Sequence, residues 1–258
     1  MVMQKIWSRL PEDSATFAHR LQRTDSLPRD EIRRVRREEQ GEVYSWDELE
    51  AGFDILRHSH RTDRLIVFRH GKTNYNHLNR VSGQHDTMLS ETGRHQAAHL
   101  RTVLPPHLDL IVCSALSRTV ETMMLGVPAD RRQHVPVLVD SRLNEVNLGE
   151  LQGRRRRHLP EFEAGDLDYA PPEGETYRDA ARRCFSSVLD IYRVFRQVGG
   201  AERTAAVFCH AGVLRILSTL GGGYRSPAAV FDIDIGNAEF VSLQACRTAL
   251  PNFWAIEP

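Results

Sequence analysis

Short apolar runs alternate with segments of helical periodicity along most of the chain, starting near Arg64. Several of these runs are apolar at every position, which is typical of strands whose two faces are both buried. Five runs are predicted to be β-strands: Leu65–Phe68, Leu110–Cys113, Val135–Val139, Ala205–Cys209 and Phe240–Leu243.

Helical segments with recognisable start and stop signals lie between these runs. Because the β and α patterns alternate, the sequence predicts an α/β fold, a three-layer sandwich in which helices cover both faces of a mainly parallel central sheet. The predicted helices are Ser90 to about Val103, Ser117 to about Leu125, a long helix that starts at the capping-box-like pair Thr176 and Asp179, and Ala211–Leu220.

The first 60 residues differ from the rest, because they are dense in charge and poor in strand-like runs. We expect residues 1–60 to form a helical N-terminal extension and residues 61–258 the main domain. Packing of the extension on that domain is the favoured interpretation, with a dimerisation arm or a lid as alternatives. A capping box and one apolar helical face support this helix: Ser45 with Glu48, then Trp46, Leu49, Phe53 and Leu56.

Composition limits the classes of partner. The chain of 258 residues carries 34 Lys and Arg against 34 Asp and Glu, so its net charge gives no reason to expect nucleic acid or an anionic membrane. No apolar run reaches the roughly 18 residues that a membrane span needs, and the amino terminus lacks the apolar core of a signal peptide. We therefore expect a cytoplasmic protein whose widely spaced cysteines, Cys113, Cys184, Cys209 and Cys246, are reduced thiols in the core.

Residues whose side chains can take part in catalysis or ligand binding follow four of the predicted strands. Ligands of open α/β sheets bind beyond the carboxyl ends of the strands, so these side chains are expected to converge at one edge. They are Arg69, His70 and Gly71 after the first strand, Ser114 and Arg118 after the second, Arg142, Asn144 and Glu145 after the third, and His210 and Gly212 after the fourth. Each alone is a weak signal, but four strand ends with complementary chemistry favour a site.

The chemistry that this set suits is phosphoryl transfer. A neutral imidazole is a nucleophile, arginine forks stabilise charge on phosphoryl oxygens, and a carboxylic acid such as Glu145 can protonate a leaving oxygen. Gly71 would let the backbone approach the ligand, and the helix after His210 would direct N–H groups at an anion. A metal mechanism fits poorly, because no metal-ligand or P-loop motif is present and arginines would oppose a cation.

Six segments in order resemble the histidine phosphatase superfamily, the phosphoglycerate mutase-like proteins. RHGKTNYN resembles the R-H-G-x-T-x-x-N signature of that family, and RVSGQHDTMLSETGRHQA resembles the segment that follows it. CSALSRTVETM, RLNEVNLGELQG, FCHAGVLRIL and IDIGNAEFVSL resemble later blocks, so the similarity covers about Arg64 to Leu243. Lys72 and Ala211 depart from the family pattern, in which Glu and Gly are common at these positions.

The resemblance implies a role for each matching position. His70 would become phosphohistidine, Glu145 would donate the proton and then activate water, and Arg69, Arg118 and His210 would hold the phosphoryl group. No metal and no organic cofactor would be needed. The substrate-binding residues would be Asn76, Thr73, Ser82, Gly83 and Ala211.

The phosphatase branch is favoured over the mutase branch. Mutases of this kind carry a long insertion after the RLNEVNLGELQG block, whereas only a short segment here separates Gly153 from the phosphatase-like PPEGETY stretch. We expect a metal-independent phosphatase that acts on a small phosphorylated metabolite, such as a sugar phosphate or nucleotide. The alternatives are a mutase-type phosphotransferase and a catalytically silent binding protein. A helical extension is compatible with a homodimer, and the Arg154–Arg157 run is either a solvated surface or a contact to a second anionic group.

Overall fold

The central element of the protein is a five-stranded sheet with the strand order β3-β2-β4-β1-β5. The computed structural model describes residues 45–60, 62–155, 166–198, 200, 202–222 and 230–244. The strands are β1 (Arg64–Arg69), β2 (Leu110–Cys113), β3 (Val137–Val139), β4 (Thr204–Cys209) and β5 (Phe240–Gln244). The first four pair in parallel and β5 pairs antiparallel with β1, so the predicted mainly parallel sheet is confirmed.

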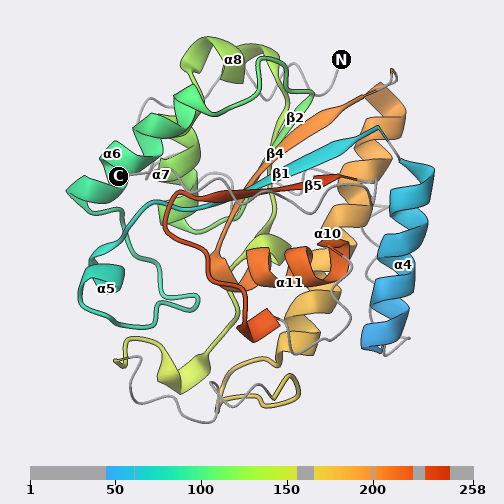
Figure 1. Ribbon diagram of the computed structural model, residues 1–258. Helices are drawn as coiled ribbons and strands as arrows, with labels where there is room; N and C mark the ends of the chain where they lie inside the picture. The colour runs from blue at the N-terminus through green and yellow to red at the C-terminus, as the bar shows by residue number, and fades with distance from the viewer. Residues whose placement is uncertain are drawn as a thin grey trace.

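Helices cover both faces of this sheet (Figure 1). On one side lie α4 (Trp46–Ser59), α10 (Tyr177–Val198) and α11 (Ala211–Gly222), and on the other lie α6 (Glu91–His99) and α7 (Ser117–Gly126). The shorter elements are α5 (Asn74–His77), η1 (Leu100–Thr102), α8 (Ala129–His134), η2 (Ser141–Leu143) and η3 (Gly149–Leu151). None of the helices in these ranges is long and apolar enough to cross a membrane.

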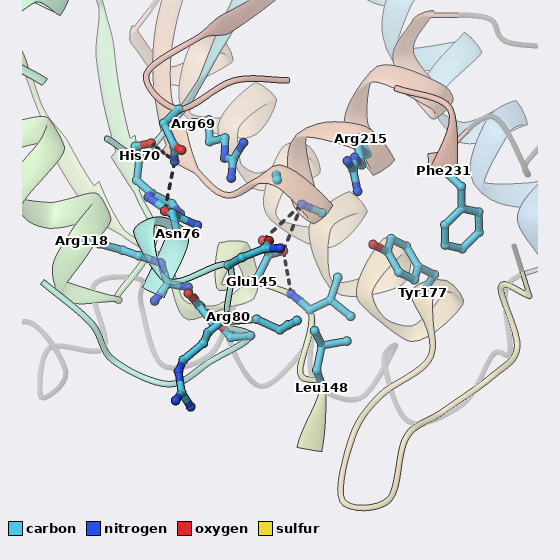
Figure 2. A pocket seen from close by; sticks show the side chains of 18 residues that line it. Arg69, His70, Asn76, Arg80, Arg118, Glu145, Leu148, Tyr177, Arg215 and Phe231 are labelled. Carbon is cyan, nitrogen blue, oxygen red and sulfur yellow. Dashed lines mark hydrogen bonds between the residues drawn. The ribbon is translucent and has the colours of Figure 1, made fainter. Parts of the chain in front are cut away.

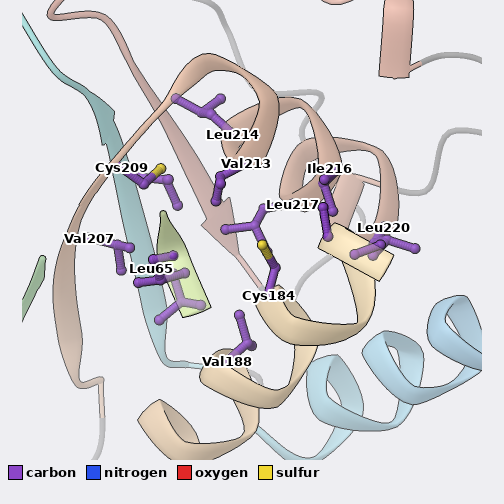
Figure 3. Packing of buried hydrophobic residues seen from close by; sticks show 14 of the residues in the cluster. Leu65, Cys184, Val188, Val207, Cys209, Val213, Leu214, Ile216, Leu217 and Leu220 are labelled. Atoms are coloured by element: carbon purple, nitrogen blue, oxygen red, sulfur yellow. The ribbon is translucent and has the colours of Figure 1, made fainter. Parts of the chain in front are cut away.

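The helical layers on both faces of the sheet explain why its strands are apolar at successive positions. Successive residues of a strand point to opposite faces, and in β1 Leu65 and Val67 join the cluster under α10 and α11, whereas Ile66 and Phe68 join the cluster under α6 and α7. Figure 3 shows the first cluster, in which α11 and α10 pack against β1 and β4. Burial of both faces therefore fixes the sheet in the middle of the molecule.

The helix α4 packs on the main domain by its apolar face. Trp46, Leu49, Phe53 and Leu56 are all buried in the cluster formed with α10 and α11. Its start is the predicted capping box, in which Ser45 Oγ accepts from the N–H of Glu48 at 3.3 Å and the Ser45 N–H donates to Glu48 Oε2 at 2.5 Å. The rest of the predicted extension, residues 1–44, lies outside the described residues.

Several element boundaries differ from the sequence prediction. The expected third strand began at Val135, but β3 begins at Val137. Val135 is the C-cap of α8, where its N–H donates to the carbonyl of Arg131, and Pro136 has no N–H to donate to a strand. The helix expected from Ser90 to Val103 is divided into α6 and the 3₁₀ turn η1.

The cysteine prediction is confirmed for three residues. Cys113, Cys184 and Cys209 are free and buried, and burial raises the pKa of all three thiols. Cys246 lies outside the described residues.

Candidate active site

His70 follows β1 directly and lies against the sheet edge with only 3% of its surface exposed. Its backbone N–H donates to Cys209 at 3.1 Å, and its Nδ1 lies 2.7 Å from the carbonyl oxygen of Gly71. A carbonyl oxygen can only accept, so Nδ1 carries the hydrogen and the lone pair of Nε2 stays available. Burial, followed by the charges of Arg118 and Arg69, holds the pKa of His70 well below its ordinary value, so the ring is neutral.

His210 directly follows β4 and lies beside His70, with the centroids of the two rings 5.2 Å apart. Its Nε2 lies 2.7 Å from Ser114 Oγ, and its Nδ1 accepts from Arg118 Nε at 3.2 Å. Because Arg118 can only donate, Nδ1 is the acceptor and Nε2 carries the hydrogen. Burial and then the charge of Arg118 hold the pKa of His210 well below its ordinary value, so this ring is neutral too.

Arg118 is fully buried and is held at both ends of its guanidinium group. Nη1 donates to the carbonyl of His85 at 2.8 Å and Nη2 donates to the carbonyl of Gly83 at 2.7 Å. Burial lowers the pKa of Arg118 to about 10, which still leaves the group charged near neutral pH. The protein therefore maintains a fixed positive charge beside both histidines.

Glu145 projects into the same site and is held by backbone N–H groups. Its Oε1 accepts from Val146 at 2.9 Å and from Gly212 at 3.1 Å, and its Oε2 lies 3.3 Å from the Gly212 nitrogen. Gly212 belongs to the first turn of α11, where free N–H groups favour an anion. The sequence led us to expect that N–H groups at the start of this helix would point at a ligand anion, but the Gly212 N–H bonds the Glu145 side chain of the protein itself. Ala211, Gly212 and Arg215 of α11 nevertheless line the cavity.

The loop that carries Glu145 is fixed by Arg183 of α10. Arg183 Nη1 donates to the carbonyls of Arg142 and Asn144, each at 2.6 Å, and Nη2 donates to the carbonyl of Glu145 at 3.0 Å. The same guanidinium pairs with Glu175 at 2.6 Å. Four acceptors on one rigid fork set the path of the loop and hence the position of the carboxylate.

Asn76 and Asn237 brace the loop after β1. Asn76 Oδ1 accepts from the N–H and hydroxyl of Thr73, both at 3.0 Å, and from Asn237 Nδ2 at 3.2 Å. Asn237 Nδ2 also lies 3.3 Å from the carbonyl oxygen of His70. These contacts link the loop after His70 to the segment before β5.

A cavity of about 490 Å³ joins these groups at the carboxyl ends of β1, β2 and β4. Figure 2 shows His70, Arg69, Asn76 and Arg118 on one side of the cavity, with Glu145 at its centre. The predicted residues that line it are Arg69, His70, Asn76, Ser82, Gly83, Arg118, Glu145 and Ala211. His210 does not line the cavity; it contacts Arg118 directly behind the lining.

Thr73 does not line the cavity, although the sequence placed it there. It is fully buried and caps α5, where its hydroxyl accepts from the N–H of Asn76 at 3.2 Å. Ser82 differs from Thr73, because it lines the cavity and its buried Oγ has no hydrogen-bond partner among the described residues. A hydroxyl in that position is suited to a polar ligand.

Several strand-end residues have other roles. Arg142 pairs with Asp140 and Asp190, each at 2.8 Å, and lies away from the cavity lining. A Cβ on Gly71 would lie 2.4 Å from the carbonyl oxygen of Gly93, so this glycine accommodates α6, and it is not among the residues that line the cavity. Lys72 is also absent from the lining.

The arginine run after Gly153 is described only in part. Arg154 and Arg155 are exposed, do not line the cavity, and approach the neighbouring loop through backbone contacts to Val81 and Arg80. Arg156 and Arg157 lie outside the described residues.

Sequence reasoning missed several residues that line the cavity. Arg80 begins the RVSGQHDTMLSETGRHQA segment, Asn237 lies in the G-N-A block and Arg215 in the H-x-G-V-x-R block, so the quoted motifs held a signal for these three. No motif distinguished the others, because they reach the cavity only when segments far apart in the chain pack together. The missed lining residues include Arg80, Leu148, Tyr177, Arg215, Phe231 and Asn237.

Metal ligation finds little support in the residues around the cavity. No group of three His, Cys, Asp or Glu side chains that could hold a metal ion occurs in the described part of the chain. The charges that line the cavity are instead those of Arg69, Arg80, Arg118 and Arg215, with Glu145 as the acidic member.

Known proteins share both this fold and the sequence around the site. Residues 65–249 match the family model of the histidine phosphatase superfamily, branch 1. A glucosyl-3-phosphoglycerate phosphatase from Mycolicibacterium vanbaalenii is 33% identical over 193 residues, covering 71% of this chain and 84% of that protein. The enzyme of the same name from Mycobacterium tuberculosis is 34% identical over 169 residues, covering 61% of this chain and 74% of that protein.

A solved structure agrees with these similarities. The mycobacterial glucosyl-3-phosphoglycerate phosphatase in complex with VO3 superposes with a TM-score of 0.60 at 33% identity, covering 69% of this chain and 90% of that chain. The shared fold and the similarity to named phosphatases place the protein among the phosphoric monoester hydrolases. Within that class, the chain belongs to branch 1 of the histidine phosphatase superfamily.

Proposed function

We propose that the protein hydrolyses a small phosphorylated sugar or sugar acid through a phosphohistidine on His70, with Glu145 as proton donor and without a metal ion. The observation that carries this proposal is the tautomer of His70. Its Nδ1 donates to the Gly71 carbonyl 2.7 Å away, which leaves the Nε2 lone pair for attack, and its depressed pKa keeps that lone pair unprotonated.

The first half-reaction transfers the phosphoryl group to the protein. Nε2 of His70 forms a bond to phosphorus while the bond from phosphorus to the leaving oxygen breaks. Protonated Glu145 gives its proton to that oxygen, and the alcohol departs. Arg69 and Arg118 stabilise the negative charge on the remaining phosphoryl oxygens, because their guanidinium groups are already fixed in place.

The second half-reaction returns the protein to its starting state. The Glu145 carboxylate takes a proton from water, the water oxygen bonds to phosphorus, and the bond from phosphorus to Nε2 breaks. Inorganic phosphate leaves, with His70 neutral and Glu145 protonated again. Glu145 suits both roles because Val146 and Gly212 fix its position through the backbone.

The substrate class rests on cavity size, charge and relatives. A cavity of about 490 Å³ falls within the range of small-molecule sites. Two similar proteins are named glucosyl-3-phosphoglycerate phosphatases, so a phosphorylated sugar acid of that kind is the first candidate.

Phosphate release in the presence of EDTA tests the proposal. The panel contains glucosyl-3-phosphoglycerate, sugar phosphates, nucleotides and 4-nitrophenyl phosphate, with wild type compared with His70→Ala. The matched control is His95→Ala, since His95 is an exposed histidine of α6. We expect release by wild type and His95→Ala, none by His70→Ala, and an acid-labile, alkali-stable phosphate on quenched wild type.

Other results would point to the alternatives. Interconversion of 3- and 2-phosphoglycerate that needs a bisphosphorylated primer would favour the mutase. Release that EDTA abolishes would contradict the metal-free route. Absence of any turnover by folded wild type, with retained phosphate binding, would favour a silent binding protein.

A further inference from the structure

The cavity extends past Glu145 to a second end that phosphoryl transfer does not require. Figure 2 shows Arg215, Tyr177 and Phe231 on the side of Glu145 opposite to His70. Because Glu145 protonates the leaving oxygen in the proposed reaction, the leaving group must extend from the phosphoryl site toward this end. The side chains here therefore face the part of the substrate that differs between phosphate esters.

Arg215 is the charged group at this end. It belongs to α11, four residues after Ala211 and therefore on the same helix face, which borders the cavity. Its Nε donates to the carbonyl of Ile233 at 2.7 Å, in the segment before β5. That bond fixes the plane of the guanidinium and leaves the Nη1 and Nη2 edge for another acceptor.

Seven other arginines pair with a carboxylate: Arg94, Arg142, Arg178, Arg182, Arg183, Arg193 and Arg203. Within the described ranges, Arg215 pairs with none. In the same ranges, Arg101 and Arg131 also bond a backbone carbonyl and no carboxylate, but Arg215 differs from them because it lines the cavity, which indicates that its acceptor comes from a ligand. Since Arg69 and Arg118 already serve the phosphoryl group, Arg215 adds a cation beyond what one phosphate needs.

The surroundings of Arg215 strengthen its attraction for an anion. Tyr177 and Phe231 pack with ring centroids 5.0 Å apart, and both border the cavity together with Leu148. Apolar walls lower the local dielectric, so a charge pair formed here is screened less than one on the open surface. The two rings also offer an apolar wall to a sugar or carbon chain.

We infer that Arg215 binds a carboxylate on the leaving group of the substrate, with Tyr177 and Phe231 as the wall beside it. The planar fork of Nη1 and Nη2 matches the two oxygens of a carboxylate. This inference rests on the proposed function, because it places the leaving group by the role of Glu145. Arg215 is thus a specificity residue that selects phosphate esters of hydroxy acids over esters of neutral alcohols.

A matched pair of ligands tests this selectivity. 3-Phosphoglycerate and racemic glycerol 3-phosphate share the phosphate and the three-carbon frame, and only the first has a carboxylate. We expect wild type to favour 3-phosphoglycerate by about 10- to 100-fold in kcat/KM, the effect of one charge-assisted pair. In Arg215→Gln this preference should fall close to one, mainly through KM, while activity on 4-nitrophenyl phosphate changes little.

Two further variants separate a specific contact from general charge or folding effects. Arg64→Gln removes one cation at the start of β1, the end of the strand opposite to His70, and should keep the wild-type preference. Arg215→Lys keeps the charge but not the fork, so it should retain only part of the preference; it also serves if Arg215→Gln does not fold. A purely structural role would lower activity on all three esters together.

The inference and the proposed function can fail separately. Hydrolysis of 4-nitrophenyl phosphate tests the function, whereas the ratio between the matched ligands tests Arg215. If wild type turns over neither ligand, titration calorimetry measures the Kd of both ligands for wild type and for Arg215→Gln. The ratio of the two Kd values then replaces the ratio of kcat/KM. A wild-type ratio near one, or a ratio that survives in Arg215→Gln, overturns the inference.

Discussion

The carboxylate of Glu145 occupies the space that a side chain on Gly212 would need. A Cβ on Gly212 would lie 2.4 Å from Glu145 Oε1 and 2.9 Å from a methyl group of Val146. The glycine N–H donates to that same carboxylate at 3.1 Å. The missing side chain therefore lets α11 hold the acid through its backbone, 67 residues away in the sequence.

Gly212→Ala should displace Glu145 and weaken general acid catalysis without removing any catalytic group. Because positioned proton transfer contributes about 10²- to 10⁴-fold, we expect kcat on an alkyl phosphate to fall by about 10- to 100-fold. With 4-nitrophenyl phosphate, whose leaving group needs little protonation, the loss should stay within roughly threefold. Steady-state kinetics with the two esters measures the difference.

Gly221→Ala is the matched control on the same helix. A Cβ at Gly221 would make ordinary contacts, the nearest being 3.5 Å from Leu243 Cδ1. This variant should keep wild-type kinetics on both esters. Equal loss on both esters in Gly212→Ala would show that the helix, and not the acid, had moved.

Arg183 should contribute to both stability and activity through the Glu145 loop. Arg183→Met removes bonds to three carbonyls and leaves Glu175, a carboxylate with 18% exposure, without its cation. Breaking such a largely buried pair is expected to lower the free energy of unfolding by about 2–4 kcal/mol. We also expect kcat to fall by about tenfold with little change in KM, because Arg183 does not line the cavity.

Arg193→Met on the same helix is the control for this prediction. Arg193 is half exposed, and its partner Asp190 keeps a second cation in Arg142, so the change should cost no more than about 1 kcal/mol. Urea unfolding of both variants makes the comparison. Equal stability of Arg183→Met and wild type would contradict the role of the clamp.

The loop that carries His70 crosses α6 at a contact between two glycines. A Cβ on Gly93 would lie 2.0 Å from the carbonyl oxygen of Lys72, and a Cβ on Gly71 would lie 2.4 Å from that of Gly93. Helix propensity alone predicts that Gly93→Ala stabilises the protein by about 1 kcal/mol. Because backbone atoms cannot move aside cheaply, we expect instead a loss of about 1–3 kcal/mol and a lower kcat. A raised Tm would contradict this prediction.

The sheet could be predicted from the sequence because its strands are buried on both faces. A run such as Leu65–Phe68 is apolar throughout, and the clusters on either side of β1 explain why. The helix α8 was missed because ADRRQH is short and has no apolar face to give a periodic signal. Val135 was assigned to a strand because apolar character alone does not show where a helix ends.

The site could be predicted only as far as strand ends and motifs specify it. His70 and Arg118 follow strands, so the topology of the sheet brings them together. The roles of the residues beside them in the sequence depend on side-chain packing. Thr73 follows His70 closely in the sequence, but its hydroxyl caps α5, and Thr73 is absent from the cavity lining. Phe231 reaches the cavity through tertiary structure alone, and no local pattern announces it.

The two neutral histidines make the stability of the fold depend on pH. Burial lowers the pKa of His70 and His210 well below the ordinary 6.5. Below about pH 6.5 the unfolded chain therefore binds protons at both positions while the folded chain does not, so the free energy of unfolding falls as the pH falls. Each histidine contributes up to about 1.4 kcal/mol per pH unit until its folded pKa is reached. Above about pH 7 this contribution is fully present and constant.

Urea unfolding between about pH 5 and about pH 7 measures this slope, in a window above the range where most carboxylates titrate. We expect His70→Asn to lower the slope by up to about 1.4 kcal/mol per pH unit, because asparagine cannot take up the proton. His95→Asn, a change at an exposed histidine of α6, is the matched control and should keep the wild-type slope. A wild-type stability that is flat across the window would mean that His70 and His210 are protonated in the folded protein, and the neutral nucleophile would then be wrong.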